Sequence, residues 1–131
     1  MKITRADEIS TGPAPADYFT GEVMSATLHQ SGGADRVATL RVHFAPGART
    51  AWHTHPHGQR LIVTQGEGWA QTDGQPKQVI RPGDVIWFEP GERHWHGASE
   101  TSAMEHIAIQ QIEDGRTADW AEQVTEADYL G

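Results

Sequence analysis

The sequence predicts a single all-β domain folded as a sandwich or barrel. Short runs of extended-type residues follow one another along most of the chain, and turn signals such as Gly32-Gly33, Asp73-Gly74 and Pro82-Gly83-Asp84 separate them. Many short strands at this spacing are typical of all-β sandwiches and barrels. The length of 131 residues fits one domain that can bury a core.

The chain divides into three parts. Residues 1–21 contain several Gly and Pro residues and no sustained periodicity, so we expect an irregular N-terminal arm that covers a sheet edge or a barrel mouth. Residues 22–112 are the predicted β-barrel, and residues 113–131 are a tail packed on it. In chain order, the predicted strands are 22–30, 36–44, 59–65, 68–72, 77–80, 85–88, 94–99 and 103–111.

Strand 36–44 illustrates the alternation on which these predictions rest. Its apolar side chains share one face, and Arg41 and His43 lie on the other. The apolar face consists of Ala38, Leu40, Val42 and Phe44. Leu40 and Val42 are therefore our first candidates for the wall of a substrate pocket inside the barrel.

The tail is expected to form a short helix. Thr117 is a capping-type residue, and Trp120 and Val124 are spaced by four residues, which places them on one helical face. We predict that this helix begins near Thr117 and packs on the barrel.

Composition narrows the classes of function. The net charge is −8, from 18 acidic and 10 basic residues, and the basic residues are scattered, which argues against a nucleic-acid partner. The longest strictly apolar run is 85–88, too short for a membrane span or a signal peptide, so we expect a cytoplasmic protein. The chain has no cysteine and eight histidines, so any metal site would use nitrogen and oxygen ligands.

Two segments predict such a metal site: residues 53–59 and the strand that begins at His94. His53 and His55 are one residue apart and share a face if the backbone is extended. Gln59 lies past the following turn and can bring its amide oxygen to the same ion. His94 opens another strand and is the expected fourth ligand, and His96 shares its face.

Three other histidines are expected at the surface. His57 lies between Pro56 and Gly58, in a turn, and His29 and His43 lie on outer or edge faces.

Strand 103–111 supplies a candidate proton carrier. Met104, His106, Ala108 and Gln110 alternate along it, so His106 is expected to face the metal chamber. A histidine near an ion but not bound to it can exchange protons near neutral pH, because the ion lowers its pKa and favours the basic form. His96 is the second candidate. For both residues the alternative role is a hydrogen bond that orients a metal ligand.

These residues match the two sequence motifs of the cupins. The first motif has the spacing of Gly47, His53, His55, Gln59 and Gly66, and the second is matched by Gly83, Gly91 and His94. The chain therefore resembles a small single-domain bacterial cupin, which implies a double-stranded β-helix, that is, a jelly-roll-like barrel. Gln59 stands where most cupins have glutamate. A neutral amide leaves more of a divalent charge uncompensated, which favours Lewis-acid chemistry over oxygen activation.

A closer resemblance, over nearly the whole chain, is to the bacterial cupin-type hydroxynitrile lyases. It is carried by residues 15–21, 46–56, 58–59, 61–64, 68–71, 82–85, 90–98, 103–104, 106, 108–110 and 119–120. This resemblance implies a manganese-dependent lyase that reversibly splits a cyanohydrin into an aldehyde or ketone and cyanide. It implies the metal ligands His53, His55, Gln59 and His94, a proton acceptor, His106, and help for the departing cyanide from His96 or Gln110.

Several alternatives stay open. The ion is expected to be Mn(II), but Fe(II), Ni(II) and Zn(II) suit the same ligands. A quercetinase-like metal oxygenase would use the same three histidines, and a non-catalytic cupin would only bind a metabolite. The expected partners are a small-molecule substrate and further copies of the chain, as a homodimer or homotetramer, with neither nucleic acid nor membrane.

Overall fold

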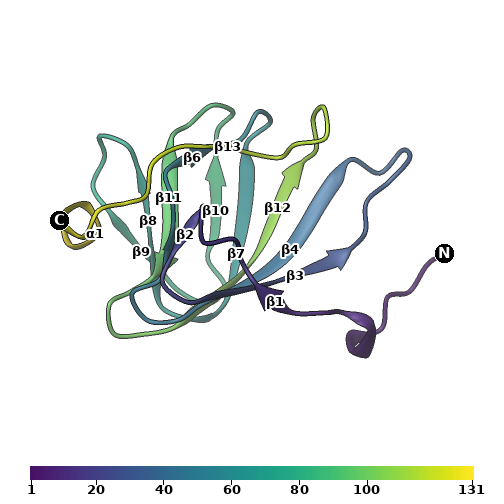
Figure 1. The fold of residues 1–131 in the computed structure, drawn as a ribbon, viewed down its shortest axis with the longest axis horizontal. Coiled ribbons are helices and arrows are strands. Elements are labelled where there is room, and N and C mark those ends of the chain that lie inside the picture. Colours follow the sequence, from purple (N-terminus) through teal and green to yellow (C-terminus); the bar gives the residue numbers. More distant parts are fainter.

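Two antiparallel sheets enclose the apolar core in the computed structural model, which describes residues 1–131 (Figure 1). The strands of the first sheet are, in spatial order, β1 (Gly12–Pro13), β3 (Val23–His29), β4 (Val37–Phe44), β12 (Met104–Gln111), β7 (Gln59–Gly66) and β10 (Val85–Phe88). Those of the second sheet are β13 (Asp119–Trp120), β6 (His53–Thr54), β11 (His94–Ala98), β5 (Arg49–Thr50) and β2 (Phe19–Thr20), with β8 (Gly68–Thr72) on β11 and β9 (Gln78–Ile80) on β8. The two curved layers make the jelly-roll arrangement that the sequence predicts.

The predicted alternation sets which side chains face inward. In the central strand β12, Met104, His106, Ala108 and Gln110 are all buried. The register places His106 beside Val42 of β4 and Val63 of β7. Inward side chains of three adjacent strands therefore line one chamber.

The eight predicted strands are confirmed, and the observed bounds of each lie within one residue of the predicted bounds. Sequence reasoning missed the two-residue strands β1, β2, β5 and β13, whereas the extended backbone expected at His53 is observed as β6. Segments this short have no periodicity of their own, because their pairing depends on partners that are distant in the sequence.

The N-terminal arm contains more order than the sequence predicts. It has a 3-10 turn, η1 (Ala6–Glu8), and the strands β1 and β2. The Phe19 ring of β2 lies 6.2 Å from the Phe44 ring and lines the interior cavity. The arm therefore closes one side of the chamber.

The prediction that the helix of the tail begins near Thr117 is wrong. Residues 119–120 form β13, which pairs with β6, and the helix α1 runs over Glu126–Leu130. The Thr125 side chain caps this helix by accepting a hydrogen bond from the Asp128 amide. The four-residue spacing misled the prediction because Trp120 packs on rings near the cavity, whereas Val124 is buried in a separate cluster with Trp52, Trp95 and Tyr129.

None of the helices has the length and apolar character that crossing a membrane would require.

Candidate metal centre

Histidines from two paired strands converge at the bottom of the chamber. His53 of β6 lies directly opposite His94 of β11, and their ring centroids are 4.3 Å apart. The His55 ring is 5.0 Å from the His53 ring and 5.5 Å from the His94 ring. All three side chains are buried. The structure therefore brings together the three histidines that the two motifs single out.

Each of these three rings is oriented by a backbone carbonyl. The Nδ1 atoms of His53, His55 and His94 face the oxygens of Ala51 (2.8 Å), Thr117 (2.6 Å) and Glu92 (2.7 Å), respectively. A carbonyl can only accept, so in each neutral ring the proton is on Nδ1 and Nε2 presents its lone pair. Metal-binding histidines in proteins are held in this way.

Burial keeps the rings neutral. It lowers the pKa of His94 to about 3, and it is the main cause that lowers the pKa of His53 and of His55. The Phe88 ring stacks on the His94 ring with the centroids 3.6 Å apart, which fixes the ring plane. Near neutral pH the three Nε2 atoms are thus available as ligands.

Gln59 brings its amide to the same place. Gly58, with a φ of 79°, turns the chain between His55 and Gln59 in a conformation that glycine favours. The Gln59 Nε2 donates to the Gln110 Oε1 at 3.1 Å, so its own oxygen faces the His94 Nε2 at 3.0 Å. Because both of these atoms are acceptors when His94 is neutral, a shared cation would satisfy them.

The donor set fits a divalent ion. The Nε2 atom of His55 is buried and has no hydrogen-bond partner. Buried polar atoms are rarely left without a partner in proteins. Three imidazole nitrogens and an amide oxygen suit Mn(II), Fe(II), Ni(II) or Zn(II). The residues present therefore fit the metal site predicted from the sequence.

A fourth imidazole extends the set. The nitrogens of His53, His94 and His96 lie within 4.8 Å of one another, so His96 rather than His55 completes the tightest group. We nevertheless favour His55 as the ligand, because its Nδ1 has the carbonyl partner shared by His53 and His94. His96 instead faces another histidine.

That histidine is His106. The His96 Nδ1 and the His106 Nε2 are 2.9 Å apart, so one ring donates a hydrogen bond to the other. Burial lowers the pKa of His106 to about 4, and burial followed by the nearby charge of His106 lowers the pKa of His96 well below its ordinary value. The outer nitrogens of the pair, His96 Nε2 and His106 Nδ1, have no partner. A proton can thus enter the pair at one end and leave at the other.

A cavity of about 110 Å³ adjoins these imidazoles. Leu40 and Val42 line it, as their alternation in β4 predicts, and so do His106, His96 and Gln110. Sequence reasoning missed the wall formed by Phe19 of the arm and by Thr117, Ala118 and Trp120 of the tail. Their only local signal is the aromatic character of Phe19 and Trp120, which does not indicate where they pack.

The other three histidines lie at the surface, as expected. His29, His43 and His57 are exposed, and each lies near one carboxylate. None of them lines the cavity.

Known proteins resemble this chain in sequence and in fold. The cupin domain family matches residues 40–110. An (R)-mandelonitrile lyase of Granulicella tundricola is 54% identical over 129 residues, which cover 98% of each chain. A cupin-like protein of Thermotoga maritima is 40% identical over 89% of both chains, with a TM-score of 0.85.

A more distant structure agrees in fold alone. A polyketide cyclase of Streptomyces resistomycificus is 18% identical, covers 98% of this chain and 90% of its own, and has a TM-score of 0.76. The match over residues 40–110 spans more than half of the chain and contains both histidine motifs. The protein therefore belongs to the cupin family.

Proposed function

We propose that this protein is a metal-dependent hydroxynitrile lyase, which reversibly cleaves a cyanohydrin into an aldehyde or ketone and cyanide. The observation that carries the proposal is the pair His96 and His106, two buried, hydrogen-bonded imidazoles on the same small cavity as the candidate metal ligands. The 54% identity to an (R)-mandelonitrile lyase, over 98% of each chain, supports the same class of reaction.

His53, His55, His94 and Gln59 would hold the metal, for which we propose Mn(II). When bound, such an ion supplies Lewis acidity, which stabilises negative charge on a substrate oxygen. The neutral amide of Gln59, in place of a carboxylate, leaves the site with more net positive charge. That charge favours an anionic substrate oxygen over a change of metal oxidation state.

The imidazole pair would carry out both proton transfers of the reaction, from the substrate hydroxyl and to cyanide. His106 takes the proton of the cyanohydrin hydroxyl, and the electron pair of the O–H bond stays on the oxygen. The carbonyl then forms as the carbon–carbon bond to the nitrile breaks, and the electron pair of that bond leaves with cyanide. His106 passes a proton to His96 along their hydrogen bond, and His96 gives a proton to cyanide, which forms hydrogen cyanide. The pair therefore holds the same number of protons before and after each turnover. Synthesis follows the same steps in reverse.

Gln110 would steady the departing cyanide. Its Oε1 accepts the hydrogen bond from Gln59, so its Nε2 is free to donate in the cavity that both residues line. A donor aimed at the nitrile nitrogen stabilises the negative charge that develops there. Leu40 and Val42 line the cavity with apolar side chains, which would exclude water and limit the size of the substrate.

Metal analysis combined with a cyanohydrin cleavage assay tests the proposal. We expect wild-type protein to contain a divalent ion and to cleave mandelonitrile or a smaller cyanohydrin. His106→Ala is expected to keep the metal and lose about 10²- to 10⁴-fold in rate, because general acid–base catalysis contributes about that much. His57→Ala, a change at an exposed histidine, is the matched control and is expected to keep wild-type activity.

Other outcomes would contradict the proposal. Full activity of His106→Ala would remove that residue from its role. Uptake of oxygen on a flavonol or diketone, without cyanohydrin cleavage, would favour a quercetinase-like oxygenase. A melting temperature raised by a metabolite, without any product, would favour a binding protein.

We also propose that the chain assembles as a homodimer or homotetramer. Val79, Val85 and Trp87 are large apolar side chains on β9 and β10 that stay 44–61% exposed in the single chain. Apolar surface of this kind often marks an interface. Light scattering that gives the mass of one chain at working concentration would reject the assembly.

A further inference from the structure

The C-terminal tail forms part of the candidate metal centre. The Thr117 carbonyl accepts the hydrogen bond from the His55 Nδ1 at 2.6 Å, and the Trp120 ring lies 4.6 Å from the His53 ring. Thr117, Ala118 and Trp120 also line the cavity. The orientation of one predicted ligand thus depends on where residues 117–120 lie.

Close to the site, a short backbone ladder holds the tail together with polar side-chain contacts, in which Arg93 donates to Glu122 and Thr20 donates to Gln123. Strand β13 contributes two residues to its pairing with β6. Beyond it, the Ala121 amide donates to the Trp52 carbonyl at 2.8 Å, and the Trp52 amide donates to the Glu122 carbonyl at 2.9 Å. A ladder this short has little stability without further packing.

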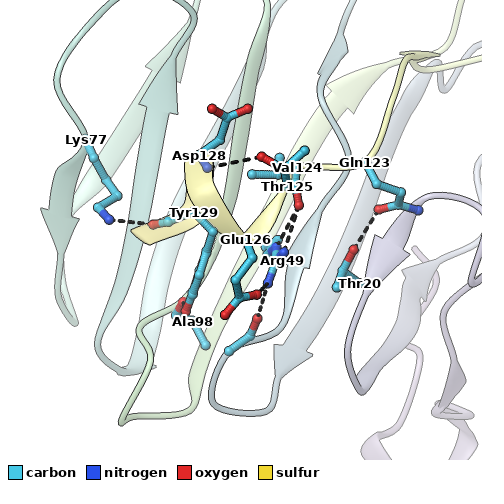
Figure 2. Close-up of polar contacts among 11 residues, drawn as sticks. Thr20, Arg49, Lys77, Ala98, Gln123, Val124, Thr125, Glu126, Asp128 and Tyr129 are labelled. Carbon is cyan, nitrogen blue, oxygen red and sulfur yellow. Dashed lines mark hydrogen bonds and ion pairs between the residues drawn. The ribbon is translucent and has the colours of Figure 1, made fainter. Parts of the chain in front are cut away.

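A buried attachment lies farther along the tail, as Figure 2 shows. Val124 and Tyr129 are each 1% exposed, and Tyr129 donates its hydroxyl hydrogen to the Ala98 carbonyl at 2.7 Å. Arg49 is buried beneath them and donates through Nε and Nη2 to the Val124 carbonyl, at 3.3 and 2.7 Å. The Arg49 guanidinium also lies 4.4 Å from the centre of the Tyr129 ring.

A second cation completes the attachment of Tyr129. The Lys77 ammonium donates to the Tyr129 carbonyl at 2.5 Å and lies 3.7 Å from the centre of the Trp69 ring. Charge-assisted hydrogen bonds are stronger than neutral ones, and cation–π contacts add to the attachment. The end of the tail is therefore fastened by Arg49, Lys77 and the buried Tyr129 ring.

We infer that Tyr129 and Arg49 are positioning residues for the metal ligand His55. By fastening the end of the tail, they hold the Thr117 carbonyl against the His55 Nδ1. This hydrogen bond keeps the proton on Nδ1 and leaves Nε2 free for a metal. If the tail loosens, the ring loses its acceptor, and it can rotate or carry its proton on Nε2, where the proton blocks metal binding. The inference rests on the proposed metal site and not on the lyase reaction.

The test compares two neighbouring substitutions in α1. Tyr129→Ala removes the buried ring, whereas Leu130→Ala changes a side chain that is 47% exposed and serves as the control. We expect Tyr129→Ala to weaken Mn(II) binding about 10- to 100-fold, the range seen when a hydrogen-bond partner of a metal ligand is lost. Leu130→Ala is expected to stay within about twofold of wild type, because exposed positions outside such features have small effects.

A second measurement uses metal-free protein. The ¹⁵N chemical shifts of the His55 ring are expected to report the Nδ1–H tautomer in wild type and in Leu130→Ala, and a mixture of tautomers in Tyr129→Ala. A purely structural role for Tyr129 would lower the melting temperature without moving these shifts.

Tyr129→Phe is a milder substitution, which can be tested if Tyr129→Ala does not fold. It keeps the ring and removes only the hydroxyl that bonds to Ala98, so we expect a smaller change in the same direction. Folded Tyr129→Phe with wild-type Mn(II) affinity and wild-type His55 shifts would overturn the inference. Wild-type protein that binds Mn(II) but cleaves no cyanohydrin would instead reject the proposed function and leave the role of the tail intact.

Discussion

The buried histidine pair predicts that metal-free protein loses stability as the pH falls below about 6.5. His106 has a folded pKa of about 4, because burial disfavours its charged form, whereas the ordinary value is 6.5. Between these two values the unfolded chain binds more protons than the folded chain. Stability therefore rises with pH in this window, and the contribution of His106 is complete only above about pH 6.5.

The size of the effect follows from the pKa difference. A shift from 6.5 to about 4 corresponds to about 3 kcal/mol, since each pKa unit is about 1.4 kcal/mol. About 2 kcal/mol of it is already lost at pH 5, where the unfolded imidazole is mostly protonated and the folded one is not. The free energy of unfolding of a small domain is about 5–15 kcal/mol, so the contribution of this single residue is measurable.

Urea unfolding of chelator-treated protein at pH 7, 6, 5 and 4 measures this dependence. His106→Gln removes the titrating group and keeps a polar side chain, so its free energy of unfolding is expected to fall less between pH 7 and pH 4, by about 3 kcal/mol. His43→Gln, at an exposed position, is expected to follow the wild-type curve. If His106→Gln and wild type lose equal stability over this range, the reasoning from burial is wrong.

Three further predictions concern the site itself. Leu40→Ala enlarges the cavity of about 110 Å³. It is expected to raise the ratio of kcat/KM for mandelonitrile to kcat/KM for a small aliphatic cyanohydrin. An unchanged ratio would show that Leu40 does not limit the size of the substrate. Gln59→Glu adds a negative charge to the ligand set and is expected to tighten Mn(II) binding while slowing cleavage about tenfold or more. Equal kcat values for wild type and Gln59→Glu would argue against the role of the neutral amide. Removal of the ion by a chelator is expected to abolish cleavage and lower the melting temperature. Mn(II) at about 100 times its Kd should restore about 2.7 kcal/mol to the free energy of unfolding. Activity that survives complete metal removal would contradict a metal-dependent reaction.

The barrel and the candidate histidine ligands could be predicted from the sequence because both have local signatures. Alternation along residues 36–44 and 103–111 places Val42 and His106 on inward faces, and both are buried in the structure. The spacing of His53, His55 and His94 matches two motifs, and the rings converge as expected. These features depend on the geometry of single strands and on turns, which nearby residues specify.

The wall that the tail forms could not be read in the same way. The spacing of Trp120 and Val124 is compatible with a helix, and only packing against separate parts of the barrel decides that Trp120 lies in a strand. The partner of His55 is the Thr117 backbone carbonyl, a group present in every residue and therefore without a side-chain signature.

The sequence by itself thus predicted the inward faces, the candidate ligand histidines and the neutral amide at Gln59, because residue type and spacing indicate them. Only the tertiary structure decided which imidazoles pair, as His96 and His106 do, and which groups hold each ring. The physical reason is that these contacts join segments far apart in the chain, such as His55 and Thr117. Their geometry follows from how the tail, the arm and both sheets pack together.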